Sequence, residues 1–319
     1  MKILKDNDIG ILKAVEILSA EGVVAFPTET VYGLGALSSS DKAVSKVFEV
    51  KGRPKFNPLI IHVANIEMAL DIGKFSETAL KLANKFWPGP LTIVLKKKNS
   101  KSISKLATAG LNTVAIRIPN NTIAQRIITK IGVPIAAPSA NVSGKLSCTK
   151  AEDIKEKLSE RIDGIILGGQ CELGLESTVI ECSENCVSLM RLGSIPIEKI
   201  KEFLKLNKIK HSYAKGVIKS PGQLLHHYSP DSNLILNQKN PNHTDLYLSF
   251  GIHPDGVKGL NLSETENLGE AAKNLFSHLH ELDRISKKLG GKTIKVAPIP
   301  EMGLGLSIND RLRRAAKKK

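Results

Sequence analysis

Long apolar runs are missing from this sequence of 319 residues, and none approaches the length needed to cross a bilayer. The N-terminal stretch MKILKDNDIGILKAVEIL mixes charged with apolar residues, which is not the pattern of a secretory signal peptide. We therefore predict a cytoplasmic protein with no membrane association. Hydrophobic residues make up 41% and charged residues 24%, an ordinary balance for a globular chain that buries a core.

Aromatic residues are scarce, at 4% with one tryptophan, which argues against an RNA-binding surface built from stacked rings. Two nucleotide-binding fingerprints are also missing, since neither G-x-x-x-x-G-K-[ST] nor G-x-G-x-x-G occurs. No Ser/His/Asp order, zincin motif or carboxylate dyad stands out either. Any catalytic site must therefore rest on other residue types, namely hydroxyls, amides and cations that position anionic groups.

Cysteine is limited to Cys148, Cys171, Cys182 and Cys186, and their spacing gives no paired C-x-x-C pattern. We expect free thiols in a reducing compartment. A metal or redox pair formed by Cys182 and Cys186 is the alternative.

Positive charge is abundant, with a formal net charge of +15 at pH 7. A basic surface attracts phosphates, on nucleic acid or on small nucleotides. Part of the excess lies in the terminal RLRRAAKKK, and much of the rest is lysine on expected helix faces. A solvated lysine-rich surface accounts for this pattern. A functional surface that contacts RNA is the more specific alternative.

Short apolar runs alternate with helical patterns over residues 1–206, which predicts an α/β domain with a mixed sheet. Ser76 is the expected N-cap of one helix, and Pro88-Gly-Pro ends it. The expected strands are 23–26, 59–63, 91–95, 113–118, 135–137, 164–167, 178–181 and 187–191. The expected helices are 8–21, 40–50, 76–87, 122–131, 151–161 and 197–206.

Residues 207–232 lack periodicity and contain glycine, proline and serine, so we predict a long connection there. Beyond it we expect a small C-terminal α/β domain, residues 233–319. Its expected strands are 233–236, 246–250 and 293–297. Its expected helices are 263–289 and, after the glycine-rich turn EMGLGLS, 309–316.

Three segments that adjoin expected strands carry candidate site residues. Lys51 and Arg53 flank Gly52 in a turn, where two cations can converge on one anion. Asn57 and His62 follow, and a solvated turn and a core histidine are the structural alternatives. Pro138-Ser139-Ala140-Asn141 follows another strand, at the edge where α/β sheets bind ligands. An ordinary capped turn is the alternative there.

The third segment, Pro27–Gly35, packs two hydroxyls, one carboxylate and two glycines into PTETVYGLG. The glycines allow the backbone to approach a ligand closely, and Glu29 is the nearby carboxylate that could hold Mg²⁺. Arg117 and Arg191 each interrupt an apolar strand. Because a buried charge is costly without a partner, an anionic substrate group is a natural candidate for each.

PTETVYGLGA, KGRPKFNPL and APSAN, in this order, resemble the YrdC-type threonylcarbamoyl-adenylate synthases. WPGPLT, VAIRIP, ESTV and RLG fit the same pattern, and SPGQLLHHYSP with GLGLSINDRLRRAA resembles the two-domain form of that family. The resemblance implies an open, twisted mixed sheet with flanking helices and a small Rossmann-like C-terminal domain. It also implies a nucleotidyltransferase that condenses L-threonine, bicarbonate or CO₂ and ATP, and that releases pyrophosphate.

The resemblance further implies residue roles, with Lys51 and Arg53 as the catalytic pair. The implied threonine-binding residues are Thr30, His62, Arg117, Ser139 and Ser177. The implied ATP-binding residues are Lys51, Arg53, Asn57, Thr113, Asn141, Ser147, Arg191 and Tyr228. Thr149 is an alternative to Ser147, and Asn112 is an alternative to Thr113. Mg²⁺ would accompany ATP without a dedicated set of protein ligands.

The product implied by the resemblance serves a downstream transferase that modifies the adenosine next to the tRNA anticodon, and weak tRNA binding is possible. An RNA-binding protein without ATP turnover is the rival interpretation. The related carbamoyl-transfer protein of hydrogenase maturation is much longer and carries C-x-x-C spacings, which this sequence lacks.

Overall fold

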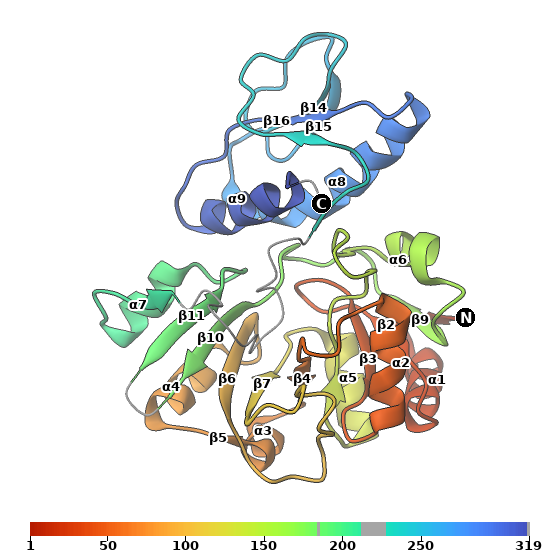
Figure 1. The fold of residues 1–319 in the computed structure, drawn as a ribbon, viewed down its shortest axis with the longest axis vertical. Coiled ribbons are helices and arrows are strands. Elements are labelled where there is room, and N and C mark those ends of the chain that lie inside the picture. The colour runs from red at the N-terminus through yellow and green to blue at the C-terminus, as the bar shows by residue number, and fades with distance from the viewer. Residues whose placement is uncertain (184–185, 212–227, 318–319) are drawn as a thin grey trace.

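The structure is a computed structural model that describes residues 1–183, 186–211 and 228–317. The chain forms two α/β bodies, a larger one before the connecting segment and a smaller one after it (Figure 1). Residues 212–227 of the expected connection lie outside the described residues.

Within the described residues, twelve strands form one mixed sheet in the order β1-β9-β2-β3-β8-β4-β7-β6-β10-β11-β12, with β5 paired to β6. Neighbours β2 and β3 are antiparallel, whereas β4 and β7 are parallel. The predicted mixed sheet is therefore confirmed. The strands are β1 (Lys2–Lys5), β2 (Val24–Phe26), β3 (Gly33–Leu37), β4 (Ile60–His62), β5 (Gly73–Lys74), β6 (Leu91–Lys97), β7 (Thr113–Arg117), β8 (Ile135–Ala136), β9 (Gly164–Leu167), β10 (Thr178–Cys182), β11 (Val187–Arg191) and β12 (Lys210–His211).

Helices cover both faces of this sheet. The helices are α1 (Asp8–Ser19), α2 (Asp41–Lys51), α3 (Ile66–Ile72), α4 (Glu77–Phe86), α5 (Thr122–Ile131), α6 (Ala151–Leu158) and α7 (Ile197–Leu204). Val24 and Phe26 belong to the apolar cluster that includes residues of α1 and α5, whereas Ala25 between them belongs to the other large cluster, which includes residues of α2. This alternation buries β2 on both faces.

Side-chain caps fix where several of these helices begin. The predicted cap Ser76 is confirmed, because its hydroxyl accepts a hydrogen bond from the Ala79 amide at 3.2 Å. Asn7, Ser40 and Asn121 cap α1, α2 and α5 in the same way.

Strands β3 and β5 and helix α3 are missing from the sequence-based predictions, as is the strand Lys258–Asn261 of the second domain. Two edge strands of the large sheet, β1 and β12, are missing as well. In β1 only Leu4 is buried, and both residues of β12 are exposed. Backbone hydrogen bonds to a single neighbour hold each strand in place, β1 to β9 and β12 to β11. Because such pairing does not need buried side chains, neither strand shows an apolar pattern. The connection predicted at 207–232 therefore contains a short strand.

The glycines of Pro27–Gly35 belong to β3 rather than to a loop. Gly33 lines the cavity described below, as expected of a residue that lets a ligand approach. Gly35 instead faces Phe26, whose Cε1 would lie 2.4 Å from a Cβ at this position. The interpretation of Gly35 as a ligand-approach residue is therefore wrong, because the core requires its small size.

The second body is a small parallel α/β domain. Four strands of the described residues pair in the order β13-β16-β14-β15. The elements are β13 (Leu234–Ile235), β14 (Leu246–Ser249), β15 (Lys258–Asn261), α8 (Leu268–Lys288), β16 (Ile294–Val296) and α9 (Leu304–Ala315). Both helices lie between this sheet and the larger domain (Figure 1). No helix within the described ranges is long and apolar enough to span a membrane.

The helix limits of this domain differ from the prediction in two places. Helix α8 begins after Asn267, whose side chain caps it, and not at residue 263. Helix α9 begins at Leu304, inside the segment expected as a turn. Its Gly305 packs so closely on the Pro300 carbonyl that no Cβ would fit, so this glycine serves helix packing.

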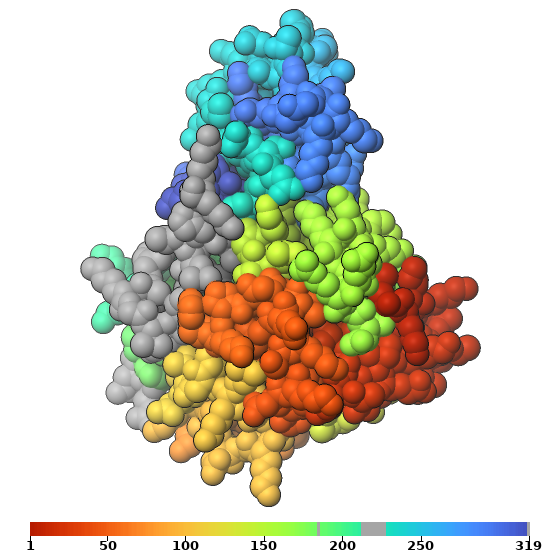
Figure 2. Space-filling model, turned by 45° about the vertical axis from the view of Figure 1, so that its right-hand side comes forward, coloured from red at the N-terminus to blue at the C-terminus, as the bar shows by residue number. Residues whose placement is uncertain are grey.

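Buried polar contacts join the two domains. The His280 imidazole lies 3.1 Å from the Ser147 carbonyl, and Ser307 donates to the Gly193 carbonyl at 2.8 Å. Arg284 pairs with Asp153 of α6 at 2.6 Å. In Figure 2 the cyan and blue surface of the second domain rests on the yellow-green surface around α6. The second domain is therefore tied to the larger one at defined positions.

Candidate active site

A cavity lies at the edge of the large sheet where several strands end. The segment after β2, the residues after α2 and the segment after β8 converge on it, so the structure brings together the three segments singled out in the sequence. The predicted residues that line it are Thr30, Arg53, His62, Arg117, Ser139, Ser177, Arg191 and Tyr228. Strand ends are the usual ligand edge of an α/β sheet.

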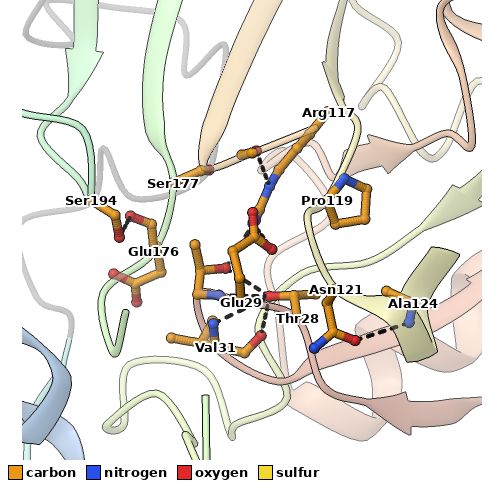
Figure 3. A network of polar contacts seen from close by, with 12 residues as sticks. Thr28, Glu29, Val31, Arg117, Pro119, Asn121, Ala124, Glu176, Ser177 and Ser194 are labelled. Carbon is orange, nitrogen blue, oxygen red and sulfur yellow. Dashed lines mark hydrogen bonds and ion pairs between the residues drawn. The ribbon is translucent and has the colours of Figure 1, made fainter. Parts of the chain in front are cut away.

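Arg117 at the end of β7 forms a buried ion pair with Glu29. The Nη2–Oε2 distance is 2.7 Å, and the two side chains are 4% and 3% exposed. Arg117 also donates to the Thr30 hydroxyl at 3.0 Å and to the Gly89 carbonyl at 3.2 Å. The two charged groups face each other in Figure 3. Glu29 is thus the counter-ion of Arg117, a contact that its interpretation as a possible Mg²⁺ ligand did not include.

The hydroxyl of Thr28 shapes the turn that carries these residues. It donates to the Val31 carbonyl at 2.7 Å and accepts from the Val31 amide at 3.3 Å (Figure 3). It also lies 2.7 Å from the Thr30 hydroxyl. This local bonding fixes the turn and places Thr30 beside Arg117 at the cavity wall.

Arg53 and Arg191 bring buried positive charge to the other side of the cavity. Arg53 donates to the carbonyls of Asn57 and Pro58 at 3.1 and 2.9 Å. Arg191 donates to the Ser177 carbonyl at 2.8 Å and to its hydroxyl at 3.0 Å. Burial, and then the neighbouring Arg191, lower the pKa of Arg53 to about 9, so it stays charged at neutral pH. Burial also lowers the pKa of Arg191. Two cations this buried favour an anionic ligand.

Lys51 is fully buried, and its ammonium group binds the backbone of the Ser139 segment. It donates to the carbonyls of Ser139 and Asn141, and lies 3.3 Å from Asn141 Oδ1. Burial, and then Arg53, lower the pKa of Lys51. Lys51 is not among the described residues that line the cavity. These contacts therefore tie the C-terminal end of α2 to the segment that follows β8.

Ser139 and Asn141 form a bonded pair in that segment. Ser139 Oγ donates to Asn141 Oδ1 at 2.5 Å, and Asn141 Nδ2 donates to the carbonyls of Val142 and Lys145, each at 2.8 Å. Asn57 is also buried, and its Oδ1 accepts no hydrogen bond from the described residues. The Ser-x-Asn pair thus presents one hydroxyl to the cavity while the amide fixes the loop.

Comparison with protein-family models assigns both domains. Residues 16–193 match the family described as "Telomere recombination", and residues 195–317 match "Threonylcarbamoyl-AMP synthase, C-terminal domain". The chain belongs to the threonylcarbamoyl-AMP synthase family.

Relatives of this family align over nearly the whole chain. The threonylcarbamoyl-AMP synthase of Pyrococcus abyssi is 40% identical over 312 residues, covering 92% of this chain and 90% of the relative. The Bacillus subtilis enzyme is 37% identical over 334 residues, covering 98% and 94%. A crystal structure of P. abyssi Sua5 complexed with L-threonine superposes with a TM-score of 0.88 at 36% identity, covering 99% of this chain and 97% of that one.

Tyr228 brings the connecting segment to the cavity of this synthase fold. Its side chain is buried, lines the cavity and packs 5.5 Å from the Phe276 ring of α8, between ring centres. Its φ of +67° lies in the left-handed region, which costs energy for a non-glycine residue and is kept only where surrounding contacts hold it. The predicted cover residue therefore sits between the cavity and the second domain.

The remaining residues predicted to bind ATP, Ser147 and Thr113, are not among the described residues that line the cavity. Ser147 is buried and donates to Glu176 Oε1 at 2.6 Å, and Glu176 lines the cavity. The alternative Thr149 is buried, and its hydroxyl has no hydrogen bond within the described residues. Thr113 begins β7, four residues before Arg117. At about 3.3 Å per residue it is roughly 13 Å away, so the structure does not bring it to the cavity.

Sequence reasoning missed the roles of Glu176 and Arg311. Glu176 belongs to ESTV, but nothing local distinguishes it from a surface carboxylate. Arg311 lies in RLRRAAKKK, interpreted as part of a solvated basic surface, yet it is 1% exposed. That interpretation is wrong for Arg311, because it pairs with Glu176, 135 positions earlier, at 3.1 Å. No periodicity in the sequence links two residues so far apart.

The four cysteines are free, as predicted, with Cys148, Cys171 and Cys182 buried and Cys186 exposed. Burial raises the pKa of the three buried thiols. The described residues contain no group of three or more His, Cys, Asp or Glu side chains that could hold a metal ion. None of the four thiols is among the described residues that line the cavity.

His62 at the end of β4 is neutral in the folded protein. Burial, and then the charge of Arg117, lower its pKa from 6.5 to about 3. In the unfolded chain the imidazole takes up its proton near pH 6.5. The unfolded state therefore binds more protons than the folded state between pH 6.5 and about 3. The contribution of His62 to stability is present above this window and is lost as the pH falls through it.

We expect His62→Gln to make folding less sensitive to acid. Between pH 6.5 and about pH 4.5, the wild-type protein should lose about 2–3 kcal/mol more unfolding free energy than the variant. Urea unfolding of both proteins at the two pH values measures this difference. Equal losses would show that His62 keeps an ordinary pKa in the folded state.

Proposed function

We propose that this chain makes threonylcarbamoyl-AMP from L-threonine, bicarbonate or CO₂ and ATP, with release of pyrophosphate, in the cavity described above. The observation that carries the proposal is the set of buried cations and hydroxyls at this cavity, in a chain whose full-length relatives are named threonylcarbamoyl-AMP synthases. One relative was solved with L-threonine.

Threonine would bind at the Arg117 side. The Arg117 guanidinium offers donors to the amino acid carboxylate, while Glu29 limits the net positive charge there. Thr30, Ser139 and Ser177 supply hydroxyls. Since a pKa near 3 makes the His62 imidazole a weak base at neutral pH, we assign it to binding and not to proton transfer.

ATP would bind at the side of Arg53 and Arg191. The threonine amine first adds to CO₂ and loses a proton, which gives a carbamate. A carbamate oxygen then attacks the α-phosphorus, and the bond to the bridging oxygen breaks, so that pyrophosphate leaves with the electron pair. Both reactants are anions, so Arg53 and Arg191 would screen their repulsion and hold them in line. Asn57, Asn141, Ser147 and Tyr228 complete the proposed nucleotide side, with Lys51 holding the Ser139 loop.

Mg²⁺ would enter as part of the substrate MgATP. Glu29 is engaged by Arg117 and Glu176 by Arg311, so the carboxylates near the cavity do not fit a dedicated protein site for the ion. The nucleotide phosphates are the donors that suit Mg²⁺. The protein groups then act by charge and position alone.

Pyrophosphate release tests the proposed function. Incubation with ATP, MgCl₂, bicarbonate and L-threonine should release pyrophosphate, and omission of L-threonine should reduce the rate to background. Mass spectrometry should detect the adenylate. Release of pyrophosphate that does not depend on threonine would contradict the proposal. Tight RNA binding with a steep salt dependence and no turnover would favour the rival RNA-binding function.

The product also defines the partners that we propose. A carbamoyl group activated by AMP needs an acceptor, and a downstream transferase that modifies the adenosine next to the tRNA anticodon would supply it. The net charge of +15 supports weak tRNA binding by the chain itself. We propose that the reaction takes place in the cytoplasm.

A further inference from the structure

Arg311 is a buried cation of the second domain that lies behind two residues of the cavity wall, Glu176 and Tyr228. It lies on α9, is 1% exposed, and its Nε is 3.1 Å from Glu176 Oε2. Its Nη2 donates to the Leu192 carbonyl at 2.7 Å, and its Nη1 pairs with Asp310 at 2.7 Å. These contacts use both ends of the guanidinium, which fixes its orientation.

Glu176 is the residue through which Arg311 reaches the cavity. Glu176 lines the cavity together with Arg53 and Arg191, and its Oε1 accepts the Ser147 hydroxyl at 2.6 Å. Figure 3 shows its carboxylate across the cavity from Arg117. The Arg311 guanidinium also lies over the Tyr228 ring, 5.0 Å from its centre. One side chain of the second domain therefore contacts both Glu176 and Tyr228.

The opposite charges of Arg311 and Glu176 suggest what their contact does for a ligand in the cavity. A carboxylate in the wall of a poorly solvated cavity repels an incoming polyanion. An adjacent guanidinium cancels most of that repulsion, provided that it is held close. A zwitterionic amino acid has no net charge, so the same wall affects it far less.

We propose that Arg311 is a positioning residue of the nucleotide side of the cavity, where it neutralises Glu176 and orients the Tyr228 ring. The second domain thereby completes the site for ATP. The assignment of this side to ATP rests on the proposed function, whereas the contact between Arg311 and Glu176 does not.

Arg311→Met tests the proposal through substrate binding measured by calorimetry, without turnover. The dissociation constant of ATP should rise by about tenfold or more, because Glu176 loses the guanidinium that lies 3.1 Å from its Oε2. The dissociation constant of L-threonine should change by less than about twofold. Arg313→Met is the matched control, since Arg313 is on the same helix but is 53% exposed and pairs with Glu301. It should bind both substrates like the wild-type protein.

Glu176→Gln provides the decisive comparison. In the Glu176→Gln/Arg311→Met double variant the carboxylate that Arg311 pairs with is gone, so ATP affinity should recover toward that of Glu176→Gln alone. A purely structural role of Arg311 predicts no recovery. If Arg311→Met alone does not fold, the double variant is compared with Glu176→Gln, and an ATP affinity about tenfold weaker in the double variant would contradict the proposal.

Two results would overturn the proposal. One is unchanged ATP affinity in folded Arg311→Met, and the other is an equal loss of ATP affinity in the single and double variants. A wild-type protein that binds ATP but makes no threonine-dependent product would overturn the proposed function instead, and would leave the role of Arg311 in ATP binding testable.

Discussion

Arg117→Met should abolish threonine-dependent pyrophosphate release and also destabilise the fold. The variant removes the donors proposed for the threonine carboxylate and leaves Glu29 buried at 3% exposure without its counter-ion. Breaking a buried ion pair in this way costs about 3–5 kcal/mol of unfolding free energy. Chemical denaturation measures the stability, and threonine titrations of pyrophosphate release measure the activity.

The double variant Glu29→Gln/Arg117→Met separates these two effects. Because it carries no uncompensated carboxylate, it should regain most of the lost stability while threonine-dependent release stays absent. Recovery of release together with stability would mean that Arg117 serves only the fold and that threonine binds elsewhere.

Arg53→Ala should reduce kcat/KM for ATP by roughly a hundredfold to a thousandfold, because it removes a buried cation proposed to act on the phosphates. The fold should survive, since the main loss is of two hydrogen bonds to carbonyls of its own loop. Steady-state pyrophosphate release measures the kinetic effect, and circular dichroism checks the fold.

The matched control is Lys55→Ala, two positions along the same loop and exposed. It should leave kcat/KM for ATP unchanged. Arg53→Lys should rescue little activity, because the single nitrogen of an ammonium group cannot reproduce the planar fork through which Arg53 donates from Nε and Nη2 to two carbonyls. Normal turnover in folded Arg53→Ala would refute the assigned role.

Local pattern was enough to predict the mixed sheet and the place of the cavity. Apolar periodicity marked the strands that end at His62, Arg117 and Arg191, and polar residues after a buried strand marked the edge where they meet. Ser76 was readable as a cap because capping depends on residues three positions apart.

Local sequence patterns could not predict the partners of the buried charges, because these partners lie far away in the chain. Arg117 was expected to await an anionic ligand, yet Glu29 already neutralises it, 88 positions earlier in the chain. Lys51 carries the charge expected of a phosphate contact, but its ammonium group is used on backbone carbonyls 88 and 90 positions later. Arg311 has the local sequence of a solvated tail and acquires its burial only from the packing of α9. Charge identifies such residues as important, whereas the partner of each charge is a tertiary property.

The position of Arg311 in the chain also has a consequence for biosynthesis. Protein synthesis runs from the N-terminus, so the strands and loops that carry Arg53, Arg117, Ser139 and Arg191 leave the ribosome before α9 does. Until residue 311 has emerged, the contact between Glu176 and Arg311 cannot form. The side of the cavity proposed for ATP would therefore be completed only after α9 has been synthesised and has packed against the larger domain.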